Sequence, residues 1–184
     1  MARNRPRIPG SSGTVHPVTP WAEPVLRTAC GTVTSFDDQL GRLVEDLFAT
    51  MYAEDGVGLA ANQIGVGLRV FVYDCPDDED VRHLGHLVNP VLVEADGVRV
   101  RGEEGCLSLP GLRAQTPRWD RALVRGQDLD GAEVEVEGTG FFARCLQHET
   151  GHLDGGVFLD HLGGLRRLRA EREVRRASWY RPQA

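Results

Sequence analysis

The sequence predicts an α+β fold, in which antiparallel β-sheets pack around one central helix and a further helix follows at the C-terminus. Amphipathic helical patterns occupy residues 35–56, 139–155 and 162–180. The long segment between the first two contains short runs that alternate apolar and polar residues and are separated by turn signals. Helices and strands thus do not alternate one for one, as they would in a parallel α/β fold.

The composition is that of one soluble globular domain. The chain has 184 residues, of which 41% are hydrophobic and 26% are charged, and this length is sufficient for a substantial core. The formal net charge of −6 argues against DNA as a partner. No apolar run approaches the roughly 18 residues of a membrane-spanning helix, so no membrane contact is expected.

The cysteines and the N-terminal residues indicate the compartment and the domain boundary. The four cysteines contain no C-x-x-C pair, and a chain with this much core has no need of disulfides, so we expect a cytoplasmic protein. Residues 1–24 are rich in proline and irregular, which predicts a flexible N-terminal leader. Residues 25–184 are then expected to form a single domain.

Residues 35–56 are predicted to form the first helix. Ser35 with Asp38 resembles a capping box at its start, and Asp55-Gly56 is a stop signal at its end. The apolar residues recur every three or four positions and form one stripe. They are Leu40, Leu43, Val44, Leu47, Phe48 and Met51.

A strand, a loop and a hairpin are predicted next. A short apolar strand at residues 68–74 is followed by an acidic, proline-containing loop at residues 75–83. Residues 86–95 and 98–105 then flank Asp96-Gly97, a dipeptide that favours a hairpin turn.

A second hairpin leads into the central helix. Residues 121–129 and 132–138 flank Asp130-Gly131 and alternate cleanly. The helix follows over residues 139–155 and ends at a glycine. Its stripe consists of Phe141, Cys145, His148 and His152, in steps of four, three and four. If this face packs into the sheet core, both histidines lie inside with the apolar residues.

A last amphipathic helix is predicted at residues 162–180. Leu162, Leu165 and Leu168 are expected to face inward. The segment LRRLRAEREVRR within it is rich in arginine, which indicates a solvated, basic outer face.

The central helix carries the pattern H-E-x-x-H, formed by His148, Glu149 and His152. Residues four apart lie on one helix face, about 5–6 Å apart at Cβ, so both imidazoles can bind one metal ion. Glu149 points to a different side, where it can act as a general base toward an attacking water. Because the pattern also occurs by chance, two ordinary core histidines are the alternative interpretation.

A catalytic zinc site needs a third protein ligand, and the residues alone leave several candidates. The extended protease pattern H-E-x-x-H-x-x-G-x-x-H has Phe158 where its last histidine belongs. Glu171 or Glu173 would serve in a zinc peptidase, although pairing with nearby arginines is a simpler role for them. Cys106 offers a thiolate from a turn bounded by glycine and proline, and Cys145 is a second thiol.

Three motifs together resemble those of the bacterial peptide deformylases. They are GVGLAANQIG at 56–65, EEGCLSLPG at 103–111 and QHETGHLDG at 147–155. The family motifs read roughly G-x-G-L-A-A-x-Q, E-G-C-L-S and Q-H-E-x-D-H-L-x-G, in the same order and with similar spacing. The resemblance extends over about residues 25–161 and implies a peptide-deformylase-like fold, with residues 25–184 as the catalytic domain.

The resemblance also implies a reaction and a site. The reaction would be metal-dependent hydrolysis that removes the formyl group from the N-terminal formylmethionine of newly synthesised proteins and releases formate. The implied metal ligands are Cys106, His148 and His152. The implied catalytic groups are Glu149 as base, with the Gln63 side chain and the Leu107 backbone N–H as oxyanion donors. The implied substrate-binding residues are Val57, Gly58, Phe141, Arg144 and Cys145.

The cofactor and the partners follow from the same resemblance. It implies one Fe²⁺ ion per chain, with Zn²⁺, Ni²⁺ or Co²⁺ as substitutes, although a Cys-His-His site suits zinc by geometry and zinc binds more tightly than ferrous iron in the usual affinity order. The implied partners are N-formylmethionyl nascent peptides and, through the basic helix at residues 162–180, the ribosome near its exit tunnel. A zinc peptidase and a non-catalytic metal-binding relative are the alternative functions.

Two positions depart from the family pattern. Gly151 stands where the common motif has Asp, as in some actinobacterial members, and the absence of lysine from the chain is consistent with such a source. Because the ligands and the base are unaffected, we expect Gly151 to alter neighbouring hydrogen bonds and not the reaction. Arg144 stands where many relatives have an apolar residue, and we expect its stem to line the methionine pocket while its charged head reaches water.

Overall fold

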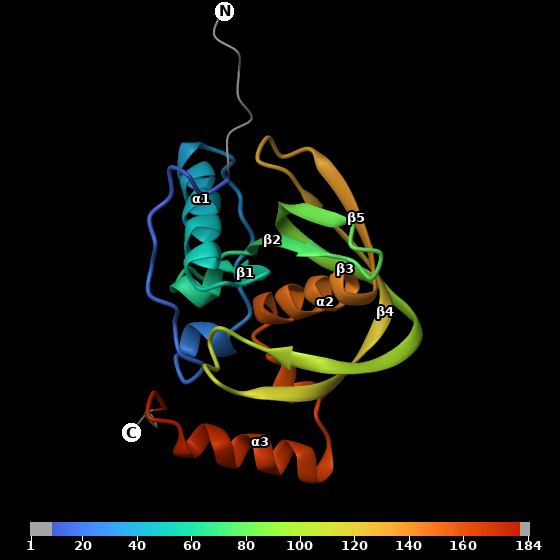
Figure 1. Cartoon of the computed structure of the whole chain (residues 1–184). Coiled ribbons are helices and arrows are strands. Elements are labelled where there is room, and N and C mark those ends of the chain that lie inside the picture. Colours follow the sequence, from blue (N-terminus) through green and yellow to red (C-terminus); the bar gives the residue numbers. More distant parts are fainter. Residues whose placement is uncertain (1–8, 181–184) are drawn as a thin grey trace, which may run out of the picture.

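The computed structural model describes residues 9–180 and has an α+β architecture (Figure 1). The strands are β1 (Gly58–Ala60), β2 (Val70–Pro76), β3 (Arg82–Gly105), β4 (Arg113–Gln127) and β5 (Glu133–Thr139). The helices are α1 (Asp38–Ala53), α2 (Gly140–Leu153) and α3 (Gly164–Arg176). Short 3-10 helices are η1 (Pro24–Arg27), η2 (Ala61–Ile64) and η3 (Phe158–His161).

The five strands form one antiparallel sheet in the order β1-β2-β3-β4-β5, so each strand pairs with its neighbours in the sequence. Figure 1 shows that the sheet is strongly curved and that α2 lies inside the curve. The predicted fold class is therefore confirmed. The predicted turn at Asp130-Gly131 is also confirmed, because it joins β4 to β5 and Gly131 has a φ of +81°.

Strand β2 separates the two main parts of the core. Phe71 and Tyr73 pack in the cluster that contains α2, whereas Val70 and Val72 pack in the cluster that contains α1. This division follows from the alternation of side chains along a strand. Because α2 is covered by the sheet, Leu146 is fully buried, and a leucine buried in this way stabilises the fold by about 1.5–3 kcal/mol.

Helix α1 has the predicted apolar stripe, but it begins differently from the prediction. All of the stripe residues belong to one core cluster, with Leu47 and Met51 fully buried. The N-cap is Asp37, whose carboxylate accepts from the backbone N–H of Gln39 and of Leu40 at 2.9 and 3.2 Å. The predicted capping box at residues 35 and 38 is therefore wrong, since the neighbouring carboxylate already satisfies the first N–H groups.

The hairpin predicted at Asp96-Gly97 is wrong. Strand β3 continues through these residues and pairs with β4 on both sides of them. Gly97 has a φ of +83° and the register shifts after Asp96, so the dipeptide forms a bulge. The carboxylate of Asp120 stabilises the bulge by accepting the Val98 N–H at 2.8 Å. The chain reverses instead at residues 106–112, which places Cys106 in the turn between β3 and β4.

The predicted C-terminal helix is confirmed as α3, but a different face points inward. Leu165 and Leu168 are 70% and 61% exposed, whereas Ala170 and Val174 are buried. Leu162 is buried as expected, although it precedes the helix. With 3.6 residues per turn, the face of Ala170 and Val174 is not the face of Leu165 and Leu168, so the two exposed leucines stand among the arginines.

The residues after α3 return to the loop between β3 and β4. The indole Nε1 of Trp179 donates to the carbonyl of Pro110 at 3.0 Å. The ring of Tyr180 stacks on that of Trp21, with 6.5 Å between ring centroids. Trp21, Trp179 and Tyr180 all pack against the core cluster that contains Leu109. The loop that carries Cys106 is therefore held from outside by the end of the chain.

The N-terminal part of the described chain also lies against a helix. In the segment predicted as a flexible leader, the Thr14 N–H donates to Asp46 at 2.7 Å and the His16 N–H donates to Thr50 at 3.0 Å, both on α1. Further along, the Trp21 N–H donates to the carbonyl of Ser108 at 2.9 Å. Residues 1–8 lie outside the described part. Within residues 9–180, no helix combines the length and the apolar character that crossing a membrane requires.

Candidate functional site

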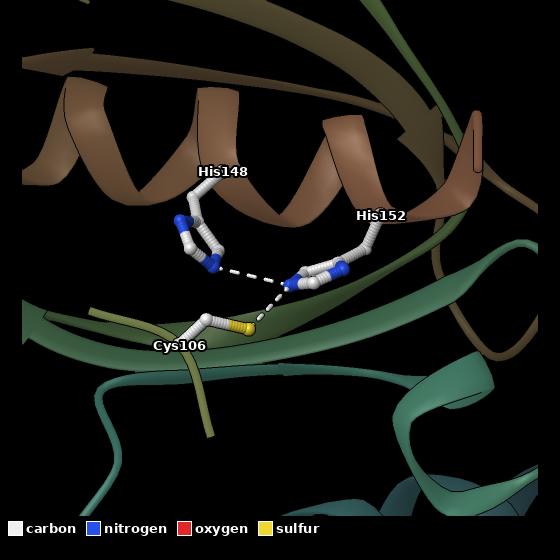
Figure 2. A group of neighbouring side chains, drawn as sticks. All are labelled: Cys106, His148 and His152. Carbon is white, nitrogen blue, oxygen red and sulfur yellow. Dashed lines mark hydrogen bonds between the residues drawn. The ribbon is translucent and has the colours of Figure 1, made fainter. Parts of the chain in front are cut away.

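The side chains of Cys106, His148 and His152 meet between α2 and the turn after β3. Their ligand atoms all lie within 4.8 Å of one another. The Cys106 Sγ is 3.3 Å from the Nε2 of His152, which is 3.1 Å from the Nε2 of His148. Figure 2 shows both imidazoles extending from α2 toward the thiol. The structure thus brings together the three residues that were predicted as metal ligands.

The buried carboxylate of Glu104 orients His148. Its Oε1 lies 3.0 Å from the Nδ1 of His148, and both oxygens accept from the Arg118 guanidinium at 3.1 to 3.2 Å. Burial by itself raises the pKa of Glu104, but the hydrogen bonds and charges of His148 and Arg118 outweigh it and hold the pKa at about 2. Because an ionised carboxylate only accepts, His148 donates from Nδ1 and turns Nε2 toward Cys106.

This set of donor atoms fits a divalent transition-metal ion. A thiolate and two imidazole nitrogens are ligands that zinc and ferrous iron accept. Burial lowers the pKa of His152 well below its usual value, and the charge of His148 lowers it further. His152 is therefore neutral, which is the form that binds a metal. In the part of the chain that the structure describes, no other group of three such side chains meets these distances.

Glu149 lies beside the ligands in a nearly dry position. It is 4% exposed, and its Oε2 has no hydrogen-bond partner among residues 9–180. Burial raises the pKa of Glu149 to about 7, although the charge of His148 acts in the opposite direction. Gly58 leaves the room that this carboxyl group occupies, because a Cβ at that position would lie 2.5 Å from its Oε1. Glu149 can therefore exchange a proton near neutral pH.

The amide of Gln63 is held with its N–H groups toward the ligands. Its Oε1 accepts from the Ala60 N–H at 2.9 Å. Its Nε2 therefore faces the Cys106 Sγ at 3.6 Å and the Ser108 hydroxyl at 3.3 Å. Leu107 lies between these two residues and lines the same pocket. The site thus presents amide donors next to the thiol.

A pocket of about 420 Å³ opens in front of these groups. The predicted site residues that line it are Val57, Gly58, Gln63, Cys106, Leu107, Phe141, Arg144, Cys145, His148 and Glu149. His152 is fully buried and is not part of the lining. Val57 and Phe141 are 38% and 39% exposed, so the pocket offers apolar side-chain surface to a ligand.

The head of Arg144 does not reach water, contrary to the prediction. The side chain is buried, and its guanidinium donates to the carbonyls of Thr116 and Val100 at 2.8 and 3.0 Å. It also lies 3.8 Å from the carboxylate of Glu104. Gly102 allows this path, because a Cβ there would approach the guanidinium to 2.8 Å. Arg144 therefore ties α2 to β3 and β4, while it still lines the pocket.

The rival third ligands lie elsewhere. Glu171 on α3 pairs with Arg167 at 2.8 Å, as its simpler role predicted. Glu173 is exposed on the same helix. Cys145 is buried in the core cluster between α2 and the sheet. Neither glutamate joins the two histidines, so the ligand set expected for a zinc peptidase is not formed.

Sequence reasoning missed several residues that support the site. Glu104 precedes Cys106 by two positions, and side-chain alternation along a strand could have placed both on one face. Arg118 gave no signal, because its pairing with Glu104 depends on the register between β3 and β4. Asn62 could not be predicted either, because its Nδ2 donates to the carbonyl of His152, far away in the sequence, at 2.6 Å.

Comparison with known proteins gives consistent matches. A family model described as polypeptide deformylase matches residues 15–168. The chain is similar to peptide deformylase 2 of Streptomyces avermitilis, with 63% identity over 177 residues that cover 96% of this chain and 95% of the relative. It is also similar to peptide deformylase 2 of Streptomyces coelicolor, with 62% identity over 95% of this chain and 97% of the relative. The similarity to actinobacterial members is thereby confirmed.

Solved structures resemble the fold over most of its length. The peptide deformylase of Thermus thermophilus has a TM-score of 0.80 and 40% identity, covering 88% of this chain and 94% of that one. The peptide deformylase of Ehrlichia chaffeensis in complex with actinonin has a TM-score of 0.82 and 33% identity, covering 91% and 99% of the two chains.

Replacing the buried carboxylate should weaken the metal site. We expect Glu104→Gln to lower the affinity for a divalent metal about 10- to 100-fold, because His148 loses the partner that orients it. It should also lower the free energy of unfolding by about 3–5 kcal/mol, because buried arginines lose their counter-charge. Chelator competition and urea unfolding measure the two effects.

The neighbouring variant Glu103→Gln is the matched control. Glu103 is exposed and pairs only with the exposed Arg113, so its loss should change the free energy of unfolding by no more than about 0.5 kcal/mol. Equal metal affinities in the two variants would show that Glu104 does not orient His148.

Proposed function

The chain belongs to the polypeptide deformylase family, and we propose that it performs the family reaction with the groups gathered around Cys106. The reaction hydrolyses the formyl group from the N-terminal formylmethionine of newly made proteins and releases formate. The observation that carries the assignment of the site is the meeting of one thiol and two imidazoles beside Glu149.

Cys106, His148 and His152 are the proposed ligands of one Fe²⁺ ion, with Zn²⁺, Ni²⁺ or Co²⁺ as substitutes. When bound, such an ion supplies Lewis acidity, which polarises a carbonyl and makes water a better nucleophile. The mixed thiolate and imidazole set supports a transition metal over Mg²⁺ or Ca²⁺, which prefer oxygen ligands. Iron in particular rests on the resemblance to the family.

Glu149 is the proposed proton carrier. Its carboxylate would take a proton from the attacking water and deliver it to the nitrogen of the leaving amine. Its pKa of about 7 supports this role, since a group that titrates near the working pH can both accept and return the proton. Gly58 leaves room for the carboxylate in this position.

Gln63 and Leu107 are the proposed oxyanion donors. As water adds to the formyl carbon, negative charge develops on the formyl oxygen, and fixed N–H donors stabilise it. The bond from the Ala60 N–H to Oε1 of Gln63 supports this role, because it holds the amide in place before the substrate arrives. The Leu107 backbone N–H belongs to the turn that also carries Cys106.

The substrate is proposed to bind along β1 and in the apolar part of the pocket. β1 is an edge strand that pairs only with β2, so its other edge, at Val57 and Gly58, can pair with an extended peptide. Phe141, Cys145 and the aliphatic stem of Arg144 would contact the methionine side chain, as their places in the pocket lining support.

We place the reaction in the cytoplasm, where nascent chains carry their formyl group. All four cysteines are free thiols, which is consistent with a reducing compartment. The proposed partners are accordingly N-formylmethionyl peptides.

Formate release from formyl-Met-Ala-Ser tests the proposed function. Protein loaded with Fe²⁺ under anaerobic conditions should release formate and leave the peptide bonds intact. Cys106→Ala should abolish both metal binding and formate release, because two imidazoles remain as the only protein ligands. Cleavage of a peptide bond, or no formate from the iron-loaded protein, would contradict the proposal.

Cys30→Ala is the control for the loss of a thiol. Cys30 is also a free, buried cysteine, but it is not among the residues that line the pocket. This variant should keep its metal and its activity. If Cys30→Ala lost both as completely as Cys106→Ala, general destabilisation would explain the result and the ligand assignment would fail.

The basic face of α3 is proposed to contact the ribosome. Leu165 and Leu168 are exposed, and the exposed arginines beside them are Arg166, Arg169, Arg172 and Arg176. Arginines attract the phosphates of RNA, with a strong dependence on salt. We expect the double variant Arg166→Gln and Arg169→Gln to co-sediment with ribosomes several-fold less than the unchanged chain at low salt. Co-sedimentation equal to that of the unchanged chain would rule out docking through this face.

A further inference from the structure

A second cavity, of about 300 Å³, lies on another side of α2. It is enclosed by α2, by the paired strands β3 and β4, and by the end of η3. Two hydrogen bonds fix the edge between α2 and β4: the Trp119 N–H donates to Gln147 at 3.2 Å, and the Gln147 amide donates back to the Trp119 carbonyl at 2.7 Å. None of the residues proposed for catalysis lines this cavity.

Arginine side chains supply the polar part of its lining. Arg118 is 5% exposed, whereas Arg99 is exposed at the rim and lies over the ring of Trp119, 5.6 Å from the centroid. A guanidinium has five N–H donors, and in Arg118 only three are engaged, by Glu104 and by the Nε2 of His161. Donors of Arg118 thus remain for a ligand.

The charges around the cavity leave one positive charge in excess. Of the charged residues that line it, Arg99 and Arg118 are positive and Asp154 is negative. For Arg99, no carboxylate lies within salt-bridge distance in the described residues. Desolvation lowers the pKa of His161 and the charge of Arg118 lowers it further, although Glu104 and Asp160 act in the opposite direction, so this imidazole adds no positive charge.

The wall on the α2 side is open at Gly151. A Cβ at this position would meet no atom within 4 Å, so nothing from the helix fills the space in front of the arginines. Leu92, Ala95 and Pro117 form an apolar part of the wall, and Thr150 and Asp154 add polar groups. The cavity therefore combines guanidinium donors at one end with space and apolar contact at the other.

We propose that this cavity binds a small monocarboxylate, whose carboxylate is held by Arg99 and Arg118 and whose short apolar tail lies against Leu92 and Pro117. A planar carboxylate matches the fork of a guanidinium. One excess positive charge favours a monoanion over sulfate or phosphate, because Glu104 and Asp154 would repel a second negative charge. The volume, at the lower end of the range for ligand sites, suits a molecule of acetate or butyrate size.

The site is tested by thermal unfolding of the metal-loaded protein in sodium acetate and in sodium chloride of equal ionic strength at pH 7. A ligand that binds only the folded state raises the unfolding temperature. In Arg99→Gln, the same rise in the unfolding temperature should require an acetate concentration at least tenfold higher. In Gly151→Asp it should vanish, because the new carboxylate would itself occupy the cavity. Arg42→Gln, an exposed arginine on α1, should respond like the unchanged chain.

Three outcomes would overturn the proposal. The first is the absence of any rise in the unchanged chain. The second is an equal rise in all four proteins, which would indicate acetate binding at the metal or a general effect of the ion. The third is a larger rise in sodium sulfate that Arg99→Gln removes, which would make the ligand an inorganic dianion. Formate release plays no part in this readout, so the result is independent of the proposed function.

Discussion

The hydrogen-bonded carboxylate of Glu104 is the interaction on which the rest of the site depends. It joins β3 to β4 through Arg118 and to α2 through His148, and all three side chains are nearly buried. Isolated burial of this charge would cost several kcal/mol, so its partners must be in place for the fold to form. The same bonds fix which nitrogen of His148 faces Cys106. The same carboxylate therefore stabilises the core and orients His148, a proposed metal ligand.

The curvature of the sheet makes this arrangement possible. Because the strands enclose α2, one helix can present His148 to the pocket and His152 to Cys106, while Leu146 packs in the core on another side. The turn that follows β3 brings Cys106 to the histidines from the far side, and Trp179 at the end of the chain holds that turn in place. At Gly58, Gly102 and Gly138, side chains from α2 come so close to the sheet that a Cβ would not fit without a shift.

The sequence predicts correctly those elements whose conformation is determined by residues within the same segment. The helix at residues 139–155 and the ligands four residues apart follow from helical periodicity, and the turn at Asp130-Gly131 follows from its own chemistry. Asp96-Gly97 has the same local signal but forms a bulge, because β3 and β4 pair on both sides of it. The burial of Arg144 and the pairing of Arg118 with Glu104 depend on strand register and packing, which leave no periodic trace in the sequence.

We propose that the thiolate of Cys106 and the imidazoles of His148 and His152, from segments some forty residues apart, hold a single metal ion. X-ray absorption spectroscopy of the zinc-loaded protein tests it most directly, because sulfur and nitrogen neighbours of the metal are distinguishable. We predict one sulfur and two imidazole nitrogens from the protein as neighbours of the zinc, and we predict that Cys106→Ala retains no zinc. A metal environment without sulfur in the unchanged chain, or zinc retained by Cys106→Ala, would contradict it.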